Sequence, residues 1–268
     1  MAAIVVLAAA CGTGETSAPV RNFDIPDTVA LGQLPEPLSN IDSLPAPPTT
    51  PAATAAPTTE PAPEPVAGAI ADSVIGSRVL LIGDAVMAST APRNDGTMCE
   101  VLTSFGWTVE IAAEPGRFIE FGDDVLDERL ERSDGASWDV AGVMLGNQFD
   151  GDLAAFAQRL DGLLQRLSPR PTIVYTLSEV DDDTPAINEI IRALPDSFRN
   201  VVVVDWAAAT EADPELLVDQ DRPQLTEQGS EVLVLYTAAA LGKTLAGEQG
   251  VPGECIPAVF ADDSAIVL

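Results

Sequence analysis

The sequence predicts an α/β domain in which a doubly wound parallel sheet of five strands carries helices on both faces. Three observations support this prediction. Short β-branched runs recur through residues 74–247, helical segments separate them, and several runs are apolar on both faces. Strand–helix alternation of this kind is typical of doubly wound domains, whose ligands bind at the carboxyl ends of the strands.

The expected elements follow from these runs in chain order. Strands are expected at residues 79–82, 108–112, 140–145, 172–177 and 201–205. Helices are expected at residues 97–105, 120–132, 152–167, 184–194 and 227–245. The clearest helix is 152–167, where Leu153, Phe156 and Leu160 begin an apolar series at helical spacing.

Residues 12–73 do not share this pattern, and we expect them to form a disordered tether. The part at 45–65 reads PAPPTTPAATAAPTTEPAPEP and has no apolar periodicity. Such a segment cannot bury enough apolar surface to offset its chain entropy. At about 3 Å per residue, an extended tether of this length would reach about 190 Å.

Residues 1–11 read MAAIVVLAAAC and predict export. The apolar run at 4–10 is too short to span a bilayer and fits the core of a signal peptide, although no Lys or Arg precedes it. The alanines before Cys11 resemble a bacterial lipobox, in which the cysteine is lipidated. We therefore expect a lipoprotein on the outer face of the cytoplasmic membrane; simple cleavage that leaves Cys11 as a free thiol is the alternative.

The other two cysteines, Cys99 and Cys255, are expected to form a disulfide, because exported proteins can keep cysteines oxidised. In the chain-entropy model, a disulfide that closes a loop as long as the one between these two cysteines stabilises the fold by about 5 kcal/mol. The bond would also hold residues 248–268, which we expect to be an irregular tail. Two separate buried thiols are the alternative.

The charge of the chain excludes nucleic acid as a partner. The 13 Lys and Arg against 42 Asp and Glu give a net charge of −29, which repels phosphate. There is no histidine, the cysteines are few and dispersed, and no acidic run has EF-hand spacing. We therefore expect neither a metal site nor a cofactor. The acidity indicates a solvated surface, with calcium or a cationic partner as the alternative.

The most specific motifs lie at two places. Residues 78–86 read RVLLIGDAV, and residues 221–229 read DRPQLTEQG. They resemble the first and last sequence blocks of the SGNH/GDSL hydrolases, whose patterns run roughly GDS and DxxH. The resemblance implies a flavodoxin-like fold with Ala85 at the place of the nucleophilic serine, Gln224 at that of the histidine base, and Asp221 at that of the aspartate orienting the base.

Two further loops fit the same family. In EPGR at 114–117, Gly116 matches the glycine whose N–H joins the oxyanion hole. Arg117 beside it would hold a substrate carboxylate or form a structural ion pair. Asp84, in the first motif, would line the same cleft or simply cap the following helix.

The third motif is LGNQ at 145–148, which resembles the family pattern G-x-N. Aligned on Gly146, the amide donor of the oxyanion hole becomes Gln148, and Asn147 fills the x position. The backbone N–H of Ala85 would be a further donor. Which of the two amide side chains faces the cleft is left open by the sequence.

The resemblance therefore implies a hydrolase scaffold without its nucleophile or base. Loss of either group costs about 10⁶ in turnover in a serine protease. The leading hypothesis is that the domain binds a cell-envelope glycan or an envelope protein in the former substrate cleft without turnover. The alternatives are an esterase, O-acetyl hydrolase or acyltransferase that uses carboxylates such as Asp84, Glu114 and Asp221, and a purely structural role.

Overall fold

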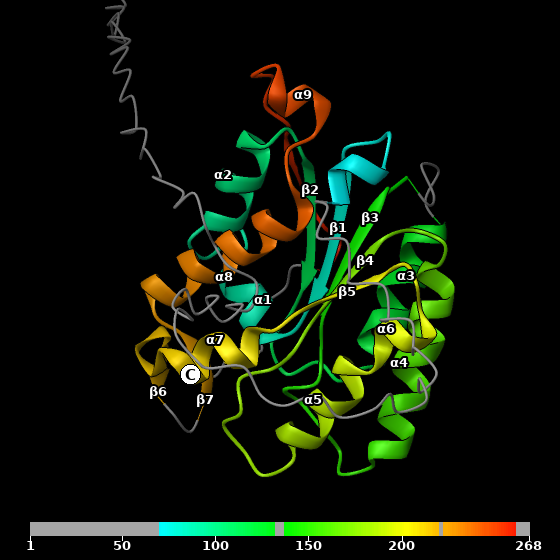
Figure 1. Cartoon of the computed structure of the whole chain (residues 1–268), viewed down its shortest axis with the longest axis vertical. Helices are drawn as coiled ribbons and strands as arrows, with labels where there is room; N and C mark the ends of the chain where they lie inside the picture. Colours follow the sequence, from blue (N-terminus) through cyan, green and yellow to red (C-terminus); the bar gives the residue numbers. More distant parts are fainter. Residues whose placement is uncertain (1–69, 132–136, 220–221, 261–268) are drawn as a thin grey trace, which may run out of the picture. The chain divides into compact units, whose positions relative to one another are not determined.

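The computed structural model describes residues 70–131, 137–219 and 222–260. Its core is a six-stranded sheet in the order β5-β4-β3-β1-β2-β8, in which every neighbouring pair is parallel (Figure 1). The strands are β1 (Arg78–Gly83), β2 (Thr108–Ala113), β3 (Val140–Met144), β4 (Thr172–Tyr175), β5 (Val201–Val204) and β8 (Cys255–Ile256). The five predicted strands and the parallel α/β architecture are confirmed.

The N-terminal predictions fall mostly outside the described residues. Cys11, the expected signal segment and residues 12–69 of the expected tether are not among them. The first described element is the 3-10 helix η1 (Ile70–Ser73), in which Ile70 is buried.

The sheet reverses its order at β1, and this reversal positions the candidate site. After β1 the chain adds β2 on one side of β1, and it then returns to add β3 on the other side. Leu80, Leu81 and Ile82 of β1 are fully buried, as expected for a central strand covered on both faces. In open α/β sheets the ligand crevice lies at such a reversal, outside the carboxyl ends of the strands.

Helices cover both faces of the sheet (Figure 1). The helices α2 (Thr97–Ser104) and α8 (Glu227–Leu241) pack together on one face, and α3 (Phe121–Glu131) and α4 (Leu153–Leu167) lie on the other. The apolar series of α4 is buried from Phe156 to Leu167 as its spacing predicts, whereas Leu153 in the first turn is exposed. None of the helices described is long and apolar enough to cross a membrane.

Two predicted helices end early for local reasons. The segment 227–245 stops at Leu241 because Gly242 takes φ +71°, and a separate short helix α9 (Leu245–Glu248) follows. The segment 184–194 divides into α5 (Thr184–Arg192) and α6 (Leu194–Ser197), which carries a proline in its first turn.

Several short elements had no sequence prediction. They are α1 (Ala85–Ser89), α7 (Trp206–Ala212), η2 (Pro214–Leu216) and the hairpin of β6 (Leu217–Asp219) with β7 (Arg222–Leu225). Elements this short hold too few residues to show a periodic pattern. The hairpin matters for the site, because β7 carries part of the last sequence motif.

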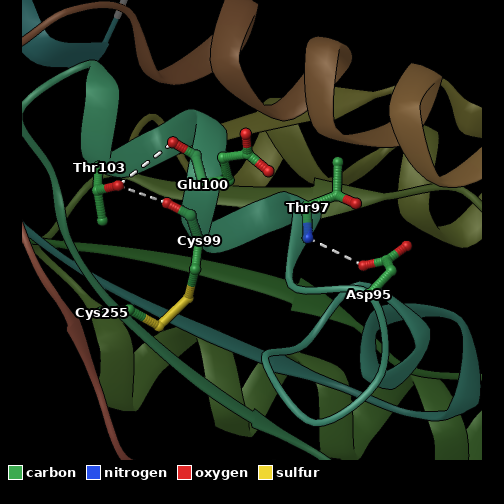
Figure 2. The surroundings of a disulfide bond; sticks show 6 residues. All are labelled: Asp95, Thr97, Cys99, Glu100, Thr103 and Cys255. Carbon is green, nitrogen blue, oxygen red and sulfur yellow. Dashed lines mark hydrogen bonds between the residues drawn. A yellow bond between two sulfur atoms is a disulfide. The ribbon is translucent and has the colours of Figure 1, made fainter. Parts of the chain in front are cut away.

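The C-terminal tail is more ordered than the sequence predicts. Cys255–Ile256 form β8, which adds a sixth strand beside β2. The expected disulfide between Cys99 and Cys255 is present, with a Cα–Cα distance of 5.6 Å (Figure 2). Gly253 lets the tail pass close to the backbone of Trp107, because a Cβ at this position would lie 1.9 Å from the carbonyl oxygen of Trp107.

Thr226 is the N-cap of α8. Its Oγ1 accepts a hydrogen bond from the Gly229 N–H at 3.0 Å and lies 3.0 Å from the carbonyl oxygen of Glu215, to which it donates. One hydroxyl thus joins the start of α8 to the segment before the hairpin.

We expect Thr226→Ala to lower the free energy of unfolding by about 1–2 kcal/mol, because an N–H at the start of α8 loses its acceptor. Thr226→Ser keeps the hydroxyl and should stay close to the wild-type value. Urea denaturation of the three proteins measures the effect, and equal loss in both variants would contradict the capping role.

Candidate functional site

The motif loops meet at the carboxyl end of the sheet. The helix α1 starts directly after β1, at the reversal of strand order (Figure 1), and the hairpin strand β7 contacts it. The loops that follow β2 and β3 reach the same edge, since both strands are parallel to β1. The fold therefore brings together segments that lie more than a hundred residues apart in the sequence.

Asp84 joins two of these loops. Its side chain is completely buried, and Oδ1 accepts the N–H of Val86 at 3.2 Å, which caps α1. Asn147 donates to the same carboxylate from its backbone N–H, 3.2 Å from Oδ2, and from Nδ2, 3.0 and 3.1 Å from the two oxygens. The start of α1 is therefore fixed to the loop between β3 and α4.

The surroundings of Asp84 change its acidity. Burial raises the pKa of its carboxyl from 3.8 to about 6, while the hydrogen bonds from Asn147 and Val86 act in the opposite direction. Both oxygens are occupied by these donors, and no part of the residue is exposed. Asp84 therefore has a structural role as placed, and its geometry does not suit a base that must reach a substrate in the cleft.

The two positions of the expected reactive groups are open to solvent. Ala85 is the first residue of α1 and is exposed, and Gln224 is exposed on the neighbouring β7. Neither side chain can act as nucleophile or as proton acceptor near neutral pH. Asp221, the third member of the expected triad, lies outside the described residues.

Two other groups that could replace the missing chemistry are engaged elsewhere. The Ser89 hydroxyl donates to the carbonyl oxygen of Val86 at 2.7 Å. Lys243 lies over the ring of Phe105, 5.2 Å from its centroid. Phe105 precedes the amino end of β2, so this ammonium is at the edge of the sheet opposite the cleft.

The loop after β2 carries Gly116 on the surface with φ +71°. Of the two interpretations of Arg117, the structure contains the ion pair: Nε donates to the buried carboxylate of Glu114 at 2.7 Å. The guanidinium also lies over the ring of Phe121, 5.1 Å from its centroid. Arg117 therefore braces the loop that presents the Gly116 backbone.

In the loop after β3, the amide side chains of Asn147 and Gln148 have different surroundings. Gly146 has φ +134°, and a Cβ there would meet Leu177 at 2.8 Å, so this turn requires glycine. Asn147 is half-buried and engaged with Asp84, whereas Gln148 is exposed. Of the two, Gln148 is the amide left available to a ligand.

A shallow hollow opens beside these loops, and the sequence did not predict it. Phe118 is 45% exposed at its rim, and Phe149 packs edge-to-face on Phe156 with ring centroids 6.1 Å apart. Phe118 lies two residues after Gly116, and Phe149 directly follows Gln148, so aromatic residues next to the motifs were the available signal. The hollow is lined by Phe118, Ile119, Glu120, Gln148, Phe149, Asp150, Ala155, Phe156 and Arg159.

The rim of this hollow is polar. Arg159 and Glu120 form an ion pair across it, and Gln148 adds an amide. The lining of the hollow thus combines aromatic and aliphatic side chains with a few polar groups. In the part of the chain that the structure describes, acidic and cysteine side chains do not gather into a group suited to a metal ion.

The buried carboxyl of Asp84 predicts a pH-dependent stability. The unfolded carboxyl ionises near pH 3.8 and the folded one near pH 6, so between these values the folded state binds more protons and the free energy of unfolding falls as pH rises. The difference in this free energy between wild type and Asp84→Asn should fall by about 3 kcal/mol from pH 3 to pH 7. Denaturant titrations at both pH values measure it.

Asp161→Asn is the matched control, because Asp161 is exposed on α4. Comparison with this variant separates the effect of burial from the effect of removing one carboxylate. A difference for Asp84→Asn that does not depend on pH would contradict the raised pKa.

Comparisons with known proteins agree on the fold. No family model and no curated protein matches the chain, but solved structures do. A protein assigned to the lipolytic G-D-S-L family from Desulfitobacterium hafniense is 16% identical, with a TM-score of 0.50 over 62% of this chain and 100% of that one.

Two further matches are more distant in structure. The C-terminal catalytic domain of Streptococcus pneumoniae peptidoglycan O-acetyltransferase A is 15% identical, with a TM-score of 0.49 over 62% of this chain and 93% of that one. A Clostridium thermocellum family 3 carbohydrate esterase is 13% identical, with a TM-score of 0.47 over 60% and 93%. At such identities the likeness concerns the fold alone. The described part of the chain thus has the SGNH/GDSL hydrolase fold that its motifs predict.

Proposed function

We propose that this domain binds a cell-envelope glycan or an envelope protein in the cleft of a hydrolase fold, without turnover. The observation that carries the proposal is the exposure of Ala85 at the start of α1 and of Gln224 on β7, a strand that contacts α1. These are the two places where the family motif puts nucleophile and base. An amide and a methyl group can contact a ligand there, but they cannot transfer an acyl group.

The surroundings favour binding over chemistry. Phe118 is exposed and Phe149 is partly exposed next to Gln148, and the buried ring of Phe156 packs against Phe149. Aromatic faces pack well against the C–H faces of sugar rings, and the amide and the ion pair at the rim suit hydroxyl groups. Of the two partners, a glycan fits these groups better than a flat protein surface does.

The active-enzyme alternative requires a carboxylate that reaches the substrate. Asp84 is buried and fully hydrogen-bonded, and Glu114 is buried and paired with Arg117. These contacts count against both carboxylates as catalytic groups. A lipid anchor at Cys11 on an extended tether would place the domain near envelope polymers, and this part of the proposal rests on the sequence alone.

The full chain should not hydrolyse a small activated acetate ester above the rate in buffer. The double variant Ala85→Ser/Gln224→His should gain turnover, since it restores the nucleophile and base of the family motif on a retained scaffold. Ester hydrolysis followed by absorbance measures both. Each single variant should remain inactive, because the two groups act as a unit that is worth about 10⁶ in turnover.

If the natural chain hydrolyses the ester and Asp84→Asn abolishes this activity, the proposal is wrong and carboxylate chemistry is favoured. An inactive double variant that is folded would show that the cleft no longer has the geometry of the hydrolases.

Phe118→Ala should weaken binding of purified cell-wall glycan fragments by about tenfold, because an exposed aromatic anchor at a binding site is worth on the order of 1–2 kcal/mol. Calorimetric titration with O-acetylated and de-acetylated fragments measures it. Leu130→Ala is the control, since Leu130 is also an exposed apolar residue but lies near the far end of α3.

Equal affinity of wild type, Phe118→Ala and Leu130→Ala would exclude the hollow as the glycan site. Absence of any glycan binding, together with a defined protein complex from solubilised membranes, would select the envelope protein as the partner.

A further inference from the structure

The C-terminal strap, defined as residues 253–260, runs along the outer edge of β2. The Gly253 N–H donates to the carbonyl oxygen of Thr103 at 2.8 Å, and the Val109 N–H donates to that of Glu254 at 2.8 Å. Two residue pairs, Val109 with Cys255 and Glu110 with Ile256, make up the strand pairing. A ladder this short contributes little stability by itself.

A disulfide provides the covalent attachment of the strap. Cys99 is buried on α2, and Cys255 is an exposed residue of β8 (Figure 2). The bond joins residues 156 positions apart in the sequence. It therefore restrains the strap against the sheet far more strongly than two strand pairs would.

The far end of the strap contacts the candidate site. The Phe260 ring packs edge-to-face on Phe121, with centroids 5.3 Å apart and an interplanar angle of 81°. Phe121 is the first residue of α3, and the guanidinium of Arg117 lies over the same ring while pairing with Glu114. The strap thus supports the loop 114–120, which presents Gly116 and one wall of the hollow.

We propose that the strap is a redox-sensitive clamp: the Cys99–Cys255 disulfide holds Phe260 against Phe121 and thereby fixes the loop 114–120. A dithiol reductant transfers two electrons and two protons to the bond. Two protein thiols form, and the reductant becomes a disulfide. The exposure of Cys255 allows this exchange at the folded protein. Release of the strap leaves Phe121 without its aromatic partner, and the loop opens more often.

Hydrogen exchange of the full chain tests the clamp without any ligand. Cys99→Ser/Cys255→Ser and Phe260→Ala should each make amides in residues 114–121 exchange about tenfold faster. Residues 172–177, on the other half of the sheet, should keep their wild-type rates. Val259→Ala is the matched control, because Val259 is an exposed neighbour of Phe260 on the same strap.

Two results would overturn the clamp. One is wild-type exchange in residues 114–121 for Phe260→Ala. The other is acceleration that spreads equally to residues 172–177 in the cysteine variant, which would indicate general destabilisation. Phe260→Ala keeps the disulfide, so the test survives if the cysteine variant folds poorly.

The consequence for ligand binding rests on the proposed function. If the domain binds glycan, Phe260→Ala should weaken binding of the same fragments about fivefold, because the loop would be open in a larger fraction of the molecules. Faster exchange without any glycan binding would support the clamp and defeat the proposed function. Glycan binding by Phe260→Ala with wild-type affinity and wild-type exchange in residues 114–121 would support the proposed function and defeat the clamp.

Discussion

The buried carboxylate of Asp84 is the interaction on which the candidate site depends. It lies where the sheet reverses its order, and it receives donors from both adjacent loops: Val86 at the start of α1 and Asn147 after β3. An unsatisfied buried donor costs about 1–3 kcal/mol, so neither loop can leave this carboxylate without a penalty. One residue that is itself completely buried thus holds both loops at this end of the sheet.

The buried and the exposed positions of the motif loops differ in how strongly the fold constrains them. Ala85 and Gln224 are exposed, and exposed side chains away from caps and cores change stability very little. A methyl group at 85 or an amide at 224 therefore leaves the scaffold intact. Asp84 and Gly146 are different, because burial and backbone geometry require them whatever the domain binds.

The sequence predicts the long elements well because their patterns are local. The strand runs and the apolar series that continues through Leu163 depend only on spacing, and the structure places them as expected. The hairpin of β6 and β7 and the helix α1 are too short for such a signal. The engagement of Asn147 with Asp84 joins loops 63 residues apart, and no local pattern carries it. The SGNH/GDSL resemblance pointed to these loops, but it could not decide which amide turns inward.

Two of the motif loops follow strands in the half of the sheet whose outer edge is covered by the strap. Without β8, β2 would be an edge strand, and the paired side chains of Glu110 and Arg129, both buried, would lie beside an open edge. The opposite edge, β5, has no added strand among the described residues, and Val202 on it is 42% exposed. The covered edge therefore belongs to the half of the sheet that carries the loops after β1 and β2. Preorganisation raises the affinity of any binding site, and in this fold the covered edge of the sheet lies on the side where the motif loops meet.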